Sequence, residues 1–393
     1  MLARILAMTV LNLRSLPARW GVAAVVVACM TGVSGVMVAM LAMAEGFHKT
    51  YASSGRADRI VVIGSGENFE GSSSIARDQA AVLLGAPGLR RLADGAPAAS
   101  LERYAVSALP MKKGGADGNI VVRGVGPQAQ AVRPEVRLVA GRWFTPGLRE
   151  VVVGRGARDQ FVGLAVGNTV TLADTAWTVT GVVEAGGGAV ESEAWGDVEV
   201  VMGAFSLTSY SSMVAALESP AAYEACRAFI AGNPVLKHVA LRENEYYAGQ
   251  TGILFQAMRG IGYLVGAIMG LGALFAAINT MYASVEARSV EIGTLRALGF
   301  QGLPILVSVV LESIVLCLAG AVLGGGGAWL GFNGNVVSTV NGASFTQIAF
   351  AFSVSPGLLM QGVAMACAIG LVGGLPPALR ATRIPIVEAL RAT

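Results

Sequence analysis

The chain has 393 residues, of which 54% are hydrophobic and only 13% are charged, with 52 glycines and a formal net charge of +3. Soluble domains carry about 25% charged residues. This composition therefore excludes an ordinary soluble enzyme and indicates a membrane protein. The charged side chains avoid four long segments almost completely, and these segments define the predicted architecture.

Residues 1–19 form the first predicted element, an arm in which Arg4, Arg14 and Arg19 lie among leucines. This pattern favours a helix that lies at the inner membrane surface, or a simple basic flank before a membrane span. Both interpretations put the arm on the cytoplasmic side.

Four segments are long and apolar enough to be transmembrane helices. The first is 20–44, which at a rise of 1.5 Å per residue reaches about 37 Å, more than the roughly 30 Å of a bilayer core. A cleaved signal peptide is the alternative for this segment, but the apolar part of a signal peptide is only about 7–15 residues long. The other three predicted spans are 256–285, 303–332 and 357–379.

The short segments between and beyond the spans set the orientation, because Lys and Arg there favour the cytoplasm. The arm, the connection 286–302 and the tail 380–393 all carry arginines, whereas the connection 333–356 has neither Lys nor Arg. We therefore expect both termini in the cytoplasm. The connection 333–356 and the large segment 45–255 are expected on the opposite side of the membrane.

The large segment is predicted to be an α+β domain inserted between the first two spans. It has a hairpin at 106–125, strands at 150–154, 169–172 and 176–183, and helices at 155–161 and 220–230. From Glu45 to Arg259 it holds 20 basic and 21 acidic residues, so it carries no signal for nucleic-acid binding. Cys226 is its only cysteine, so it is either a buried free thiol or part of an intermolecular disulfide.

Motifs for catalysis and metal binding are missing from the sequence. The chain has no G-x-x-x-x-G-K-[ST] string, so we do not expect it to hydrolyse ATP itself. It has no H-E-x-x-H string and no G-x-S-x-G string, and Ser72–Ser74 has no histidine nearby in sequence. We therefore predict no catalytic residue, no metal and no cofactor on this chain, although a triad assembled in three dimensions stays formally open.

Two polar residues, Glu312 and Asn279, fall inside predicted spans and form a candidate intramembrane site. A carboxylate at the bilayer centre costs on the order of 3 kcal/mol, so such a residue is a functional candidate. The alternative places Glu312 at the cytoplasmic boundary, because residues 312–332 alone are long enough to span.

Glycines four residues apart recur in the last three spans. Lipid gives helices no hydrophobic reason to associate, so small residues that let backbones approach predict helix contacts. The partner helix could belong to this chain or to another. The predicted packing residues are Gly262, Gly266, Gly270, Gly320, Gly324, Gly370 and Gly374.

The connection 286–302 carries the most specific motif. Ser284–Phe300 reads SVEARSVEIGTLRALGF, in which apolar and charged residues alternate as in a short amphipathic helix. It resembles the R-x-x-E-I-G-x-L-R-A-L-G signature of the FtsX/MacB-like ABC permease family. The resemblance implies an ATPase-coupling role for Glu286, Arg288, Glu291, Ile292, Gly293, Leu295, Arg296, Leu298 and Gly299.

Other strings resemble the same family. The end of the chain, 376–391, is similar to the usual family ending P-A-x-x-A-x-x-x-P-x-x-A-L-R. Strings similar to the MacB-type periplasmic core domain occur at 141–144, 150–154, 166–168 and 179–182.

The resemblance implies a permease subunit in the inner membrane of a bacterium, with the large domain in the periplasm. Its partners would be a cytoplasmic ABC ATPase dimer that binds ATP and Mg²⁺, a second permease copy in a homodimer or related heterodimer, membrane lipid and, in some systems, a periplasmic adaptor of the membrane-fusion type. ATP-driven movement, called mechanotransmission, would then export or extract a substrate. One alternative is an FtsX-like subunit that signals to a periplasmic enzyme, and another is a bare structural anchor.

Overall fold

The computed structural model describes residues 9, 20–299, 301–340, 345–383 and 385, which divide into two compact units. Unit 1 contains the chain up to Glu45, residues 256–335 and the chain from Phe352 on. Unit 2 contains residues 46–255 and 336–351.

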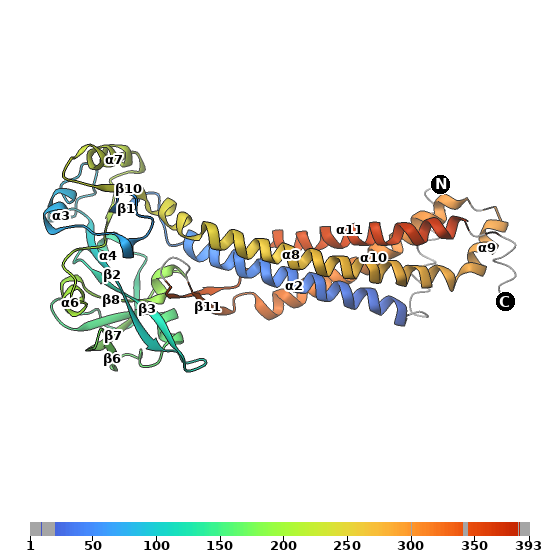
Figure 1. Ribbon diagram of the computed structural model, residues 1–393, viewed down its shortest axis with the longest axis horizontal. Coiled ribbons are helices and arrows are strands. Elements are labelled where there is room, and N and C mark those ends of the chain that lie inside the picture. Colours follow the sequence, from blue (N-terminus) through green and yellow to red (C-terminus); the bar gives the residue numbers. More distant parts are fainter. Residues whose placement is uncertain (1–8, 10–19, 300, 341–344, 384, 386–393) are drawn as a thin grey trace. The chain divides into compact units, whose positions relative to one another are not determined.

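Unit 1 is a bundle of long helices that run alongside one another (Figure 1). They are α2 (Trp20–Ala52), α8 (Glu243–Glu286), α10 (Gly302–Phe332) and α11 (Pro356–Arg383), and the short α9 (Ser289–Ala297) follows α8. Among the described residues these four long helices are the ones with the length and apolar composition to cross a membrane. Each predicted span lies within one of these helices. A segment in lipid has no water to hydrogen-bond its backbone N–H and C=O groups, and a helix satisfies these groups internally.

The helices extend beyond the predicted spans. α2 continues to Ala52, α8 begins at Glu243, and α11 ends at Arg383. The first residues of α8 and the last residues of α2 therefore belong to unit 2, so two helices continue without a break from one unit into the other.

Glycines in α10 and α11 lie where helix backbones come closest. A Cβ atom on Gly324 would overlap the Thr31 carbonyl oxygen and lie 2.8 Å from the Gly35 nitrogen, both on α2. A Cβ atom on Gly370 would lie 2.7 Å from Cα of Ile314, and one on Gly374 would lie 2.8 Å from Cβ of Ser313. The helices facing these glycines thus belong to the same chain.

The remaining glycines of the predicted set also face helices of this chain. A Cβ on Gly320 would lie 2.7 Å from the Val27 oxygen on α2. On α8, a Cβ on Gly262 or Gly266 would lie 3.1 Å from Leu41 or 3.0 Å from Met37. A Cβ on Gly270 would be in ordinary contact with Ile369 of α11, at 3.6 Å.

Unit 2 is built on a ten-stranded sheet with the order β10-β1-β9-β2-β3-β8-β5-β7-β4, and β6 pairs with β7. The strands are β1 (Arg59–Gly64), β2 (Ala99–Pro110), β3 (Asp117–Val125), β4 (Arg137–Gly141), β5 (Glu150–Gly154), β6 (Thr169–Leu172), β7 (Thr175–Glu184), β8 (Glu193–Asp197), β9 (Ser212–Ala216) and β10 (His238–Arg242). Its helices are α3 (Arg77–Leu83), α4 (Ala129–Val132), α5 (Arg155–Gln160), α6 (Val198–Ala204) and α7 (Tyr223–Gly232), with short 3₁₀ turns η2 (Glu70–Ser72), η3 (Ala189–Ser192) and η4 (Pro220–Ala222).

The predicted elements of the domain are present. β2 and β3 form the expected antiparallel hairpin, and β5, β6 and β7 match the predicted strands within a residue or two. The predicted helices correspond to α5 and to η4 followed by α7. Five strands that complete the sheet were not predicted from the sequence: β1, β4, β8, β9 and β10.

The connection between α10 and α11 differs from the simple loop that was predicted. It contains the antiparallel pair β11 (Val336–Val340) and β12 (Gln347–Ala351), which belongs to unit 2. Both strands are rich in β-branched and aromatic residues, which favour extended backbone. The Ala349 nitrogen donates to the Ser192 hydroxyl at 2.9 Å, which joins β12 to η3.

Besides a smaller cluster around Trp195, the core of unit 2 contains two large hydrophobic clusters. One contains Cys226, which is fully buried on α7, and the other contains Trp177 on β7. Burial raises the pKa of the Cys226 thiol to about 11. The thiolate is the reactive form, so the structure supports the interpretation of Cys226 as an unreactive core residue.

Candidate functional site

The coupling motif folds as the short helix α9 between α8 and α10. Arg288 precedes its first residue, and the helix ends at Ala297. Gly299 follows with a φ of +87°, a conformation that glycine adopts without steric cost and that commonly ends helices. The amphipathic segment predicted from the sequence is therefore a helix of two to three turns.

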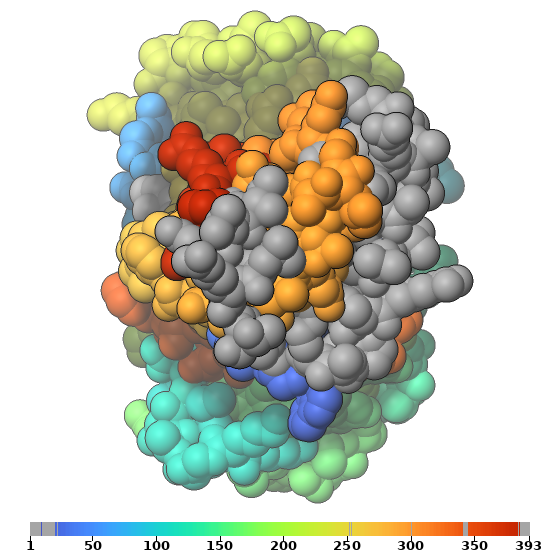
Figure 2. Space-filling view, turned by 90° about the vertical axis from the view of Figure 1, so that its right-hand side faces the viewer, coloured from blue at the N-terminus to red at the C-terminus, as the bar shows by residue number. Residues whose placement is uncertain are grey.

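The residues of the motif separate into two faces. Ile292 and Gly293 are buried, and Leu295 packs against the same core cluster of unit 1. Glu291 and Leu298 are 65% and 72% exposed. Figure 2 shows this end of the bundle, where α9 and the start of α10 (gold to orange) reach the surface beside the last turns of α11 (red). The exposed large apolar side chains of this segment are Val290 and Leu298.

Arg288 connects the motif to α10. Its Nε donates to Glu291 Oε2 at 3.2 Å, and its Nη1 donates to Glu312 Oε2 at 3.3 Å. Glu312 is 2% exposed, and Arg288 is also buried. Breaking a buried ion pair by removing one partner costs about 3–5 kcal/mol, so α9 and α10 should move together at this point.

The other candidate residues lie in different surroundings. Asn279 is exposed on α8, so it is not buried beside Glu312. Glu286 is exposed at the last residue of α8, and Arg296 is half-buried in the last turn of α9. The structure thus groups Glu312 with the coupling motif, through Arg288, instead of with Asn279.

Unit 2 contains a buried charge network that the sequence analysis missed. At its centre is Arg123 on β3, whose Nε and Nη2 donate to the two carboxylate oxygens of Glu193 at 2.7 and 2.8 Å. Its Nη1 donates to Glu102 at 3.0 Å and to Glu70 at 3.1 Å. The planar fork of a guanidinium can serve several acceptors at once, so one arginine holds three carboxylates.

The network continues to the first residue of α8. Arg133 pairs with Glu102 and lies 3.6 Å from Glu243, while Arg59 Nε donates to Glu243 at 2.6 Å. Burial opposes the charge on Glu102, but Arg133 and Arg123 outweigh it and lower the pKa of Glu102. Burial dominates at Glu243 and raises its pKa.

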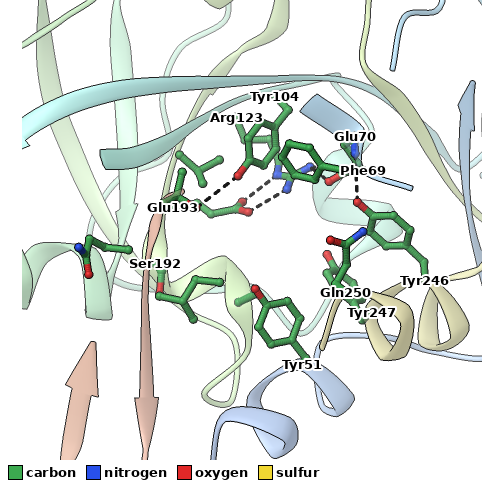
Figure 3. Close-up of a pocket in the computed structure, with 15 residues that line it drawn as sticks. Tyr51, Phe69, Glu70, Tyr104, Arg123, Ser192, Glu193, Tyr246, Tyr247 and Gln250 are labelled. Atoms are coloured by element: carbon green, nitrogen blue, oxygen red, sulfur yellow. Dashed lines mark hydrogen bonds and ion pairs between the residues drawn. The ribbon is translucent and has the colours of Figure 1, made fainter. Parts of the chain in front are cut away.

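A small cavity lies beside this network (Figure 3). Aromatic side chains from several elements surround it, among them Tyr51, Phe69 and Tyr246, and Arg123 and Glu193 form one side. Its volume of about 40 Å³ has room for a few water molecules. This volume is too small for a drug-sized ligand, so we interpret the charge network beside the cavity as a structural feature of unit 2.

A sequence signal for the network exists in the strands. Arg123 interrupts the apolar run Ile120–Val125, and Arg59 begins the apolar run of β1. Charged residues inside strands that are otherwise fully apolar predict buried, paired charges. Their partners could not be predicted, because Glu70 and Glu193 lie 53 and 70 positions away from Arg123.

Two of the strings that resemble the MacB-type core domain meet in the fold. Arg142 donates to both carboxylate oxygens of Glu150, at 2.7 and 2.6 Å, and Glu150 also accepts from the Thr145 nitrogen at 2.8 Å. The bond from Arg142 is the main cause that lowers the pKa of Glu150 to about 2. This pair closes the loop between β4 and β5.

Comparisons with known proteins agree with the division of the chain into a large domain and a membrane bundle. Residues 22–231 match the family model of the MacB-like periplasmic core domain, and residues 263–386 match that of the FtsX-like permease C-terminal region. The two matched regions together contain all of the predicted coupling residues and most of the external domain.

Among curated relatives, the uncharacterized ABC transporter permease YknZ of Bacillus subtilis (strain 168) is 33% identical over 132 residues, which cover 33% of this chain and 31% of YknZ. The macrolide export ATP-binding/permease protein MacB of Rhodopseudomonas palustris (strain HaA2) is 28% identical over 305 residues, which cover 71% of this chain and 44% of that protein. The chain therefore spans less than half the length of either relative.

Two solved structures are similar to about half of the chain. The extracellular domain of the ABC-type transporter YknZ from Gram-positive bacteria aligns with a TM-score of 0.35 and 16% identity, covering 47% of this chain and 99% of that domain. The periplasmic region of MacB from Actinobacillus actinomycetemcomitans aligns with a TM-score of 0.37 and 14% identity, covering 48% and 90%.

Proposed function

Because this chain belongs to the family of MacB-like and FtsX-like ABC transporter permeases, we propose that it couples ATP hydrolysis by a cytoplasmic ABC ATPase dimer to movement of its periplasmic domain. The ATPase binds ATP and Mg²⁺, and the permease itself carries no catalytic site. The coupled movement exports a substrate or extracts it from the outer leaflet of the inner membrane.

The observation that carries this proposal is the division of α9 into two faces. Its exposed face, with Glu291 and Leu298, is available to a soluble partner, and its buried face packs into the bundle. A push on the exposed face therefore acts on the core of unit 1. The pair of Arg288 with Glu312 passes the displacement on to α10.

The route to the periplasmic domain follows from helix continuity. α8 runs from Glu243 to Glu286, so its cytoplasmic end precedes α9 and its first residue is held in the charge network of unit 2. A displacement of α8 along its axis therefore acts on Arg59 and Arg133, and through Glu102 on Arg123. This is the structural basis that we propose for mechanotransmission.

We further propose the topology and assembly that this mechanism requires. The chain lies in the bacterial inner membrane with both termini in the cytoplasm and the large domain in the periplasm. A second permease copy, identical or related, forms the other half of the membrane portion, and a periplasmic adaptor completes an export system. The arginines near the cytoplasmic ends, such as Arg380 and Arg383 in the last turn of α11, support this orientation.

Co-purification tests the proposal directly. The tagged full-length chain is purified from its native host in mild detergent, and the Mg-ATP hydrolysis that accompanies it is measured. We expect an ABC ATPase to co-purify, and Leu298→Glu to remove it by placing a charge on the docking surface. Leu148→Glu is the matched control, because Leu148 is an exposed leucine of unit 2. The proposal fails if no ATPase accompanies the chain, or if the two variants behave alike.

A further inference from the structure

The charge network of unit 2 contains more buried carboxylates than buried arginines. Three arginines and four glutamates take part, and each of them is at most 6% exposed. They are Arg59, Arg123, Arg133, Glu70, Glu102, Glu193 and Glu243. With every group ionised, the formal charge of the network is therefore −1. A buried charge without a counter-charge is strongly destabilising, so the folded domain needs one more positive charge at this place.

The unbalanced carboxylate lies on the side of the network that faces the cavity. Glu102 and Glu243 each face two of the arginines. Glu70 and Glu193 share Arg123, which is their one ion-pair partner among the described residues. Both of these carboxylates and Arg123 line the cavity. The missing positive charge is thus needed at the cavity wall.

A tyrosine hydroxyl at the same cavity lacks a partner in the protein. Tyr247 on α8 lines the cavity and is 7% exposed, and its hydroxyl makes no hydrogen bond to any described residue. Buried hydroxyl groups in folded proteins almost always have a partner, which can be an ordered water molecule or an ion. The contents of the cavity must therefore supply the partner of Tyr247.

The cavity wall combines oxygen atoms with aromatic rings (Figure 3). Ser192, Gln250 and Tyr247 add neutral oxygen atoms to those of the two carboxylates. Five rings also line the cavity: Tyr51, Phe69, Tyr104, Tyr246 and Tyr247. Aromatic rings attract cations, and the Arg123 guanidinium already lies 5.5 Å from the centre of the Tyr104 ring. The wall therefore favours a cation over an anion or an uncharged solute.

The volume and the charge of the cavity limit the ligand to a small monovalent cation. About 40 Å³ has room for one small ion with one or two water molecules. Divalent ions such as Ca²⁺ and Mg²⁺ take six or more oxygen ligands, several of them free carboxylates or waters. Glu70 and Glu193 already accept N–H bonds from Arg123, so they can offer a cation only part of their binding capacity. A charge of +1 also equals the deficit of the network.

We propose that this cavity binds one small monovalent cation, of the size of Na⁺, K⁺ or NH₄⁺, between Glu70, Glu193 and the Tyr247 hydroxyl. The ion completes the charge balance of the network that holds the first residue of α8. The proposal concerns unit 2 by itself and is independent of ATPase coupling.

Thermal unfolding of the full-length chain in detergent tests this site. The midpoint is measured in the chlorides of sodium, potassium, ammonium and N-methylglucamine at one pH and one ionic strength, because the last cation is too large for the cavity. We expect at least one of the three small ions to raise the midpoint saturably, by about 3–8 °C at about 10–100 times its dissociation constant. The ion that saturates at the lowest concentration is the ligand. Equal midpoints in all four salts would overturn the proposal.

The same measurement distinguishes the cation from a proton. Burial raises the pKa of Glu243, so a proton on this carboxyl is the other way to balance the network. A proton would make the midpoint depend on pH and leave it indifferent to the choice of salt. That outcome, like equal midpoints at a single pH, would overturn the proposal.

Variants test the two features that define the site. Tyr247→Phe keeps the ring and should raise the ion concentration needed for half of the effect about tenfold. Tyr223→Phe is the matched control, because the Tyr223 hydroxyl donates to the Ala240 oxygen elsewhere in unit 2. Glu70→Gln removes the excess charge and should abolish the ion-dependent rise, while Glu199→Gln, at an exposed position, keeps it. If the two tyrosine variants respond alike to the salts, or if Glu70→Gln keeps the full rise, the assignment is wrong.

Discussion

Unit 2 buries seven arginine and glutamate side chains in one network around Arg123, whereas unit 1, in its described residues, buries the single pair Arg288 and Glu312. Unit 2 also has two large hydrophobic clusters, as expected of a domain that folds in water. Unit 1 has a large hydrophobic cluster as well, and it also brings helix backbones into contact at glycines. The comparison indicates that the composition and packing of unit 2 suit water and those of unit 1 suit lipid. The one charge pair buried in the described part of unit 1 therefore needs a functional explanation.

The largest expected effect comes from breaking the network of unit 2. Arg123→Met removes the cation that holds Glu70, Glu102 and Glu193 together, so Glu70 and Glu193 lose their buried arginine while Glu102 keeps only Arg133. We expect a loss of about 3–5 kcal/mol in the free energy of unfolding, the usual cost of an uncompensated buried charge. The thermal unfolding midpoint of the full-length chain in detergent measures it.

Arg77→Met is the matched control for this prediction. Arg77 pairs with Glu199 at the surface of unit 2, and both side chains are exposed. Exposed ion pairs contribute about 0–1 kcal/mol, so the midpoint should change little. If Arg123→Met and Arg77→Met lower the unfolding midpoint by similar amounts, burial of the network does not contribute to the stability of unit 2.

A smaller effect is expected from breaking the glycine contacts of unit 1. In Gly324→Ala the new methyl group would collide with the backbone of α2 at Thr31 and Gly35, which should cost about 1–3 kcal/mol. Gly326→Ala is the control on the same helix, because a Cβ there meets no atom within 4 Å. The control should be neutral or stabilising by up to about 1 kcal/mol, since alanine favours helix. Equal unfolding midpoints would exclude close packing at Gly324.

The smallest effect concerns the pair of Arg142 with Glu150, and it depends on pH. The pKa of Glu150 is lowered from 4.5 to about 2, so the folded state holds this proton less tightly than the unfolded state. The contribution to stability is therefore complete above pH 4.5 and is lost as the pH falls to about 2. Glu150→Gln should remove this part of the pH dependence of the unfolding midpoint. If the unfolding midpoints of the variant and the natural chain change in parallel between pH 4.5 and about pH 2, the prediction is contradicted.

Much of the architecture could be predicted from the sequence, because hydropathy alone determines where a helix can cross a bilayer. The hairpin at Val106–Val125 and the strand at Glu150–Gly154 also follow from local alternation and turn residues. The buried network could not be predicted in this way. The partners of Arg123 come from η2, β2 and β8, and only the sheet topology brings these elements together.

The coupling segment shows a similar limit at the level of single residues. Its motif predicted a short amphipathic helix and named Arg288 among the coupling residues, and the charge of Glu312 within a span made that residue a candidate. Sequence alone paired Glu312 with Asn279 as polar residues in the membrane, whereas packing pairs it with Arg288. Which face of α9 is buried likewise depends on the neighbouring helices, because the apolar residues Leu295 and Leu298 differ in exposure.

A double-mutant cycle on Arg288 and Glu312 tests the coupling account most directly. The rate of Mg-ATP hydrolysis is measured for complexes of the ABC ATPase with the natural chain, Arg288→Gln, Glu312→Gln and the double variant. If this pair transmits movement from α9 to α10, each single variant should lower the rate while the ATPase stays bound, and the double variant should be no slower than the worse single variant. Independent, multiplicative losses, or single variants with full activity, would contradict the account.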